Sequence, residues 1–139
     1  MLLLRENRLG RGVVFLVSLF LNLYPFLSDC RAEARNQIDT RSKITFSLEQ
    51  LNESGLYGPP DGLRALHYEF CIPGDSDHEA EVRQIDPTIQ IFKTSPGRVG
   101  CTDEEYLCVG NTHQPDFRMV LCKLANLPYI KRIDQVFFE

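Results

Sequence analysis

Apolar and polar residues alternate along residues 64–72, and this pattern predicts a half-buried β-strand. The large apolar side chains fall on every second position, so they share one face of the strand. These are Leu66, Tyr68, Phe70 and Ile72. The residues between them fall on the opposite face, so one side of the strand is expected to be buried.

Three further segments have the β-branched and aromatic composition of strands. They are residues 89–93, 106–110 and 129–138. Proline or glycine residues lie close to each segment, which limits the length of the predicted strands.

Two segments carry helix signals. Ser76 is followed three residues later by Glu79, which forms a capping box, and the predicted helix runs to Ile85. The second helix begins after Pro115 and has apolar side chains at helical spacing. These side chains are Phe117, Val120, Leu121 and Leu124.

The order strand, helix, strand, strand, helix, strand predicts an α+β fold of the ferredoxin-like split βαβ type (βαββαβ). In this arrangement a four-stranded antiparallel sheet carries two helices on one face. The first strand, the third strand and the second helix supply the predicted core. Its residues are Leu66, Tyr68, Phe70, Ile72, Leu107, Val109, Phe117, Val120, Leu121 and Leu124.

The first 34 residues have the layout of an export signal. Three arginines precede an apolar run over residues 13–28, and Ala32-Glu33-Ala34 follows as a small-x-small cleavage site. The apolar run is shorter than the about 20 residues that a membrane span needs, which favours cleavage over anchoring. The sequence therefore predicts a secreted or periplasmic protein, with membrane contact only through an uncleaved signal segment.

The remaining chain is predicted to have two parts. Residues 35–62 form an N-terminal extension with a short helix that begins at Ser47 and a Pro/Gly-rich linker over residues 58–62. Residues 63–139 form the ferredoxin-like domain. We expect the extension to lie at the periphery of this domain.

Five cysteines are present, and Cys30 lies in the signal, where lipidation of its thiol is an alternative fate. An oxidising destination favours disulfides among the other four. Strand alternation places Cys71 and Cys108 together on the sheet face away from the helices, so this pair is the first candidate. Cys101, in the adjoining loop, is nearly as good a partner for Cys71. Cys122 lies on the second helix and is the poorest partner.

No catalytic, cofactor-binding or metal-ligating set follows from the sequence. His67, His113, Cys71 and Cys108 could gather on one face, but no CxxC, HxxH or HExxH spacing supports a metal site. Cys108 and His113 lie about 16 Å apart along one strand, since each residue adds about 3.3 Å. A thiol–imidazole pair is therefore excluded, and we expect neither a cofactor nor an enzyme.

The chain has a formal net charge of −4 and an isoelectric point near 5.4. Such a balance gives no electrostatic reason to bind nucleic acid. Another protein is the expected partner. The function predicted from these features is a small, exported, non-catalytic binding or scaffolding module.

Residues 124–134 resemble the closing helix-to-strand segment of subtilisin-type propeptides. Those propeptides are ferredoxin-like inhibitors and folding aids for their proteases. The resemblance covers about a tenth of the chain. It implies an alternative function, that of a secreted protease inhibitor or propeptide-like chaperone.

Overall fold

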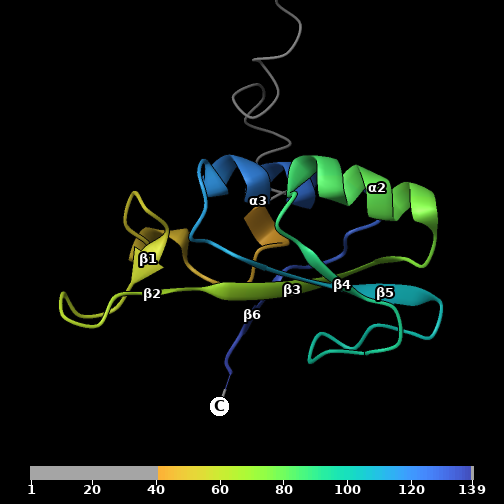
Figure 1. Ribbon diagram of the computed structural model, residues 1–139, viewed down its shortest axis with the longest axis horizontal. Helices are drawn as coiled ribbons and strands as arrows, with labels where there is room; N and C mark the ends of the chain where they lie inside the picture. Colours follow the sequence, from red (N-terminus) through yellow and green to blue (C-terminus); the bar gives the residue numbers. More distant parts are fainter. Residues whose placement is uncertain (1–40, 139) are drawn as a thin grey trace, which may run out of the picture. The chain divides into compact units, whose positions relative to one another are not determined.

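The computed structural model describes residues 41–138, which belong to one compact unit (Figure 1). The predicted signal peptide and its cleavage site lie outside the described residues. The elements are η1 (Leu48–Gln50), β1 (Leu56–Tyr57), β2 (Arg64–Ala65), β3 (His67–Pro73), α2 (Ser76–Ile85), β4 (Gln90–Phe92), β5 (Glu105–Asn111), α3 (Phe117–Asn126) and β6 (Asp134–Val136).

The main sheet has four antiparallel strands in the order β4–β5–β3–β6. Its centre is the pairing of β3 with β5, which runs from His67 opposite Asn111 to Pro73 opposite Glu105. Strands β1 and β2 form a separate two-stranded sheet. Helices α2 and α3 lie on the same side of the main sheet (Figure 1). The prediction of an α+β fold with two helices and a four-stranded antiparallel sheet is confirmed.

The two helices begin differently. Asp75, rather than the expected Ser76, caps α2, and its carboxylate accepts from the backbone N–H groups of Asp77 and His78 at 3.0 Å each. Helix α3 follows Asp116, which has a positive φ of 54° and makes no side-chain cap. Its position therefore depends on packing rather than on capping.

The hydrophobic core lies between the helices and β3. Tyr68, Phe70 and Ile72 of β3 are fully buried, as are Val82 of α2 and Leu121 of α3. Burying side chains of this size contributes about 1.5–3 kcal/mol each, so this layer is the main source of stability.

A buried carboxylate connects the end of α2 to the sheet. Asp86 is fully buried and accepts hydrogen bonds from the Tyr68 hydroxyl at 3.0 Å, the Thr88 hydroxyl at 2.6 Å and the Gln114 amide at 3.2 Å. These donors offset the cost of removing the carboxylate from water. Burial and the neighbouring Asp86 carboxylate raise the pKa of Tyr68, so its hydroxyl remains a donor.

The N-terminal extension is not peripheral to the domain. Leu51 is 4% exposed and belongs to the same core as β3 and α3. The Arg118 guanidinium of α3 donates to the carbonyl oxygens of Leu48 at 3.1 Å and Leu51 at 3.0 Å. The predicted boundary at residue 63 therefore does not separate the extension from the core, because residues 41–62 supply apolar side chains to it.

The turn before β1 also packs tightly on the domain. Gly55 has a φ of +73°, and a Cβ atom there would lie 1.8 Å from the Thr112 carbonyl oxygen. The Thr112 hydroxyl donates to the Gly55 carbonyl. Only glycine fits both the backbone conformation and the close approach.

The contribution of the extension can be measured by truncating Leu51. The variant Leu51→Ala should lower the free energy of unfolding by about 2–5 kcal/mol, because it leaves a cavity in a closed core. Chemical denaturation monitored by circular dichroism gives this value. The matched control is Leu63→Ala, since Leu63 is 46% exposed and its truncation should cost less than about 0.5 kcal/mol. Equal, small losses of unfolding free energy in the two variants would mean that Leu51 is not part of the core.

Candidate functional site

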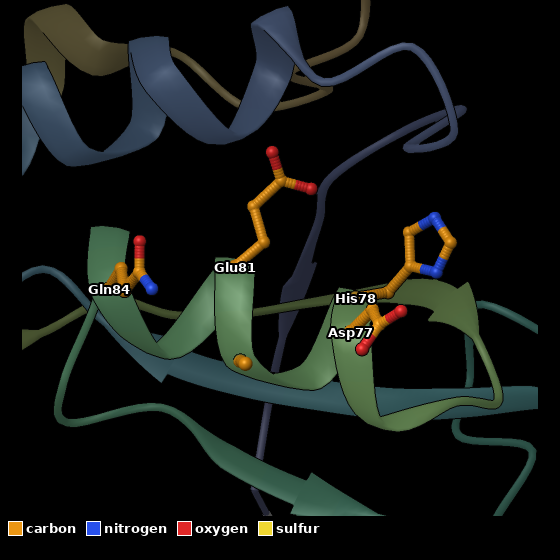
Figure 2. Close-up of a pocket in the computed structure, with 5 residues that line it drawn as sticks. Asp77, His78, Glu81 and Gln84 are labelled. Atoms are coloured by element: carbon orange, nitrogen blue, oxygen red, sulfur yellow. The ribbon is translucent and has the colours of Figure 1, made fainter.

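A shallow depression of about 410 Å³ lies on α2 (Figure 2). Its lining is polar and acidic. The lining residues are Asp77, His78, Ala80, Glu81 and Gln84. Figure 2 shows His78 and Glu81 projecting from the same side of the helix.

Asp75 orients His78 at the start of the helix. The His78 ring nitrogen Nδ1 lies 2.7 Å from the Asp75 carboxylate, which also caps the helix. The backbone and side-chain hydrogen bonds from His78 lower the pKa of Asp75 below its ordinary value of 3.8. Because Nδ1 is engaged, Nε2 is the ring nitrogen left to meet a ligand.

Tyr129 connects the depression to the segment between α3 and β6. Its hydroxyl donates to Glu81 Oε2 at 2.7 Å, and its ring meets the His78 ring edge-on with a centroid distance of 4.4 Å. Burial and the Glu81 bond raise the pKa of Tyr129. Its phenol therefore acts as a positioning donor.

The depression presents polar groups to a ligand. Its lining offers carboxylates, an imidazole and an amide, but no hydroxyl or thiol nucleophile. This site was not identified from the sequence, because no role was assigned to His78. The signal was present in Asp75, which precedes His78 by three residues and so shares a helix turn with it.

The predicted pairing of Cys71 with Cys108 is wrong, and Cys71 forms its disulfide with the second candidate, Cys101. The reason is the strand register. Cys71 lies opposite Leu107, whereas Cys108 lies opposite the core residue Phe70. Cys108 is therefore on the helix side of the sheet, where it is a free, fully buried thiol.

Burial also makes the Cys108 thiol a poor nucleophile. Removal from water raises the pKa of its thiol to about 12. At neutral pH the thiolate that a nucleophile requires is not formed. His113 is occupied elsewhere, since its Nδ1 lies 3.2 Å from the Ser54 carbonyl oxygen.

Leu107 and Val109 were predicted to face the helices, but they lie on the helix-free face of the sheet. The small residues Cys108 and Gly110 take the helix-facing positions of β5, opposite the large Phe70 and Tyr68 of β3. A Cβ atom at Gly110 would come within 2.6 Å of the Tyr68 ring. The large Tyr68 and Phe70 of β3 thus require small residues opposite them. The helix-facing positions of β5 are therefore one residue away from those predicted.

The other predicted core residues lie on the helix side. Val120 is half-buried against the core, and the rest are buried within it. These are Leu66, Tyr68, Phe70, Ile72, Phe117, Leu121 and Leu124.

The loop between β4 and β5, residues 93–104, covers part of the sheet face opposite the helices (Figure 1). We call it the clasp loop. Beneath it lies Glu69, a charged residue only 3% exposed, whose carboxylate accepts from the backbone N–H of Val99. Leu107 is 5% exposed on the same face. This cover could not be predicted from the sequence, because the loop has no regular structure.

Residues 41–138 contain no group of three or more His, Cys, Asp or Glu side chains placed to hold a metal ion. Of the four residues weighed for such a site, Cys71 is in a disulfide and Cys108 lies on the other face. Within the same range, no helix is both long and apolar enough to cross a bilayer.

Comparison of the chain with family models, curated proteins and solved structures finds no match. Its function is therefore interpreted from the geometry of the described residues.

The lowered pKa of Asp75 predicts a pH dependence. A carboxylate with a depressed folded-state pKa stabilises the fold above its unfolded pKa of about 4 and loses that contribution as the pH falls through the folded value. Asp75→Asn keeps a capping oxygen but does not titrate. Its melting temperature should therefore fall less than that of the wild type between about pH 5 and pH 2.

The control for this measurement is Asp77→Asn. The Asp77 carboxylate accepts no hydrogen bond within residues 41–138, so its loss should change the pH profile less. Identical acid profiles for the wild type and Asp75→Asn would contradict the assigned role of the Asp75 carboxylate.

Proposed function

We propose that this protein is an exported, non-catalytic binding or scaffolding module that meets another protein through the helix-free face of its sheet. We also propose that the domain has the ferredoxin-like split βαβ topology. The strand order β4–β5–β3–β6 and the two helices on one side support that topology.

One observation carries the proposal: a band of exposed and half-buried side chains crosses the helix-free face from edge to edge. Phe92 of β4 pairs with Leu107, so Val109 is its diagonal neighbour on β5. Val109 pairs with Glu69, so His67 is its diagonal neighbour on β3. The His67 ring meets Phe138 edge-on at 4.9 Å.

The exposure of this band is what favours a protein partner. Phe92 is 44% exposed and Phe138 is 68% exposed, and Val109 and His67 between them are half-buried. Diagonal neighbours on a sheet lie roughly 7–8 Å apart, so the band is continuous enough for one partner to cover. Aromatic side chains of this kind dominate the energetics of protein interfaces.

The other features of the domain agree with a binding role. Cys108, a free thiol, is fully buried, and the depression on α2 has no nucleophile in its lining. The Cys71–Cys101 disulfide is compatible with an extracellular destination. The net charge of −4 favours protein over nucleic acid as the partner.

Photo-crosslinking in the exporting cell tests the proposal. A crosslinking amino acid at position 92 or 138 should give a discrete protein adduct, and one at position 119 on α3 should not. Met119 is the matched control, because its 44% exposure equals that of Phe92. Excess wild-type domain should suppress the adduct, whereas the double variant Phe92→Ser/Phe138→Ser should fail to do so.

The same adduct pattern at positions 138 and 119 would show that contacts are unspecific and would contradict the proposal. The alternative function, protease inhibition, predicts a different result. Residues 35–139 would then inhibit a subtilisin-type protease, and we expect no inhibition if the domain is only a binding module.

A further inference from the structure

We propose that the Cys71–Cys101 disulfide is a redox-controlled clasp: its reduction by a dithiol releases residues 93–104 from the sheet and uncovers Glu69 and Leu107. The inference does not require the proposed partner, because it concerns how much of the helix-free face is accessible. Three observations support it.

First, the clasp loop has almost no buried anchor besides the disulfide. In residues 93–104, Cys101 is the one buried residue, at 7% exposure. All other side chains of the loop are exposed or half-buried. Segments with few buried contacts open at the lowest free-energy cost, so the covalent bond is the main restraint on this loop.

Second, apart from the disulfide, the polar attachments of the middle of the loop to the sheet meet at one residue, Val99. The Val99 N–H donates to the Glu69 carboxylate, and the Arg132 guanidinium donates to the Val99 carbonyl at 3.1 Å. Gly97 packs directly on Leu107, where a Cβ atom would come within 2.6 Å of its side chain. The ends of the loop are held separately, by the Lys93–Glu79 ion pair at 3.2 Å and by the Gly74 N–H, which donates to the Glu104 carbonyl at 2.8 Å. Loss of the bond at Cys101 therefore leaves Val99 as the polar attachment of the middle of the loop to the sheet.

Third, the covered surface includes a charged group. Glu69 is a carboxylate at 3% exposure, and removing such a group from water is costly unless its hydrogen bonds are replaced. Lifting the loop restores water to this carboxylate. The disulfide thus holds the clasp loop over the Glu69 carboxylate, which gains hydration when the loop opens.

The chemical step is thiol–disulfide exchange. One thiolate of the dithiol attacks the sulfur of Cys71, which is half-buried and so more accessible than Cys101, and Cys101 leaves as a thiolate. The second thiolate of the reagent then attacks the mixed disulfide and releases Cys71. The dithiol gives up two electrons and two protons and becomes a cyclic disulfide, while the protein gains two thiols.

Limited proteolysis with trypsin tests the clasp. The Arg98–Val99 bond lies in the loop, and its Val99 N–H is held by Glu69 in the closed form. Dithiothreitol should raise the rate of cleavage after Arg98 at least about tenfold, because proteolysis follows the population of the open form. Cleavage after Arg83, within α2, should not accelerate.

Cys108 provides an internal control for folding. Its buried thiol should resist alkylation while Cys71 and Cys101 become labelled, as mass mapping of the peptides would show. The double variant Cys71→Ser/Cys101→Ser tests the same bond without a reductant and should be cleaved after Arg98 as fast as the reduced wild type. Cys108→Ser should respond to dithiothreitol as the wild type does.

Three outcomes would overturn the proposal. Unchanged cleavage after Arg98 with both cysteines labelled would mean that Glu69 and Arg132 hold the loop without the bond. Labelling of Cys108 at the same rate as Cys71 would mean that reduction unfolds the domain. If the double variant Cys71→Ser/Cys101→Ser fails to fold, the disulfide is required for the stability of the whole domain rather than for closure of the loop alone.

Discussion

The antiparallel pairing of β3 with β5 is the constraint on which the rest of the structure depends. Its register opposes Tyr68 to Gly110 and Phe70 to Cys108, so these two large side chains each have a small one beside them. The same register sends Cys71, Glu69 and Leu107 to the other face. A slip of one residue would exchange the two sets and place a carboxylate in the core.

The two faces of the sheet have different kinds of cover. The helix face is closed by apolar packing against α2 and α3, and the Asp86 carboxylate is accommodated there by hydrogen bonds from Tyr68, Thr88 and Gln114. The opposite face is covered in part by a loop with one buried residue and a covalent bond. Apolar packing is lost only on unfolding, whereas a disulfide can be cut while the core stays intact, and this difference makes a local opening physically reasonable.

The depression on α2 and the band on the helix-free face occupy opposite sides of the sheet. Asp75, His78, Glu81 and Tyr129 form a hydrogen-bonded set that fixes the start of α2 against the segment before β6. This set is explained by helix capping and packing. The band from Phe92 to Phe138 satisfies no such internal need, and for this reason we assign binding to that face.

Local periodicity and capping residues were enough to predict the order of the main-sheet strands and the two helices, the start of α2 and the helix-facing side of β3. The sequence also predicted Cys71 as a disulfide cysteine and Cys101 as its second candidate. Tertiary structure decided the face of Cys108, Leu107 and Val109, since small residues on β5 are selected by large ones on a strand distant in sequence. It also decided the burial of Leu51 and Glu69, because irregular segments carry no periodic signal and their burial depends on what packs over them.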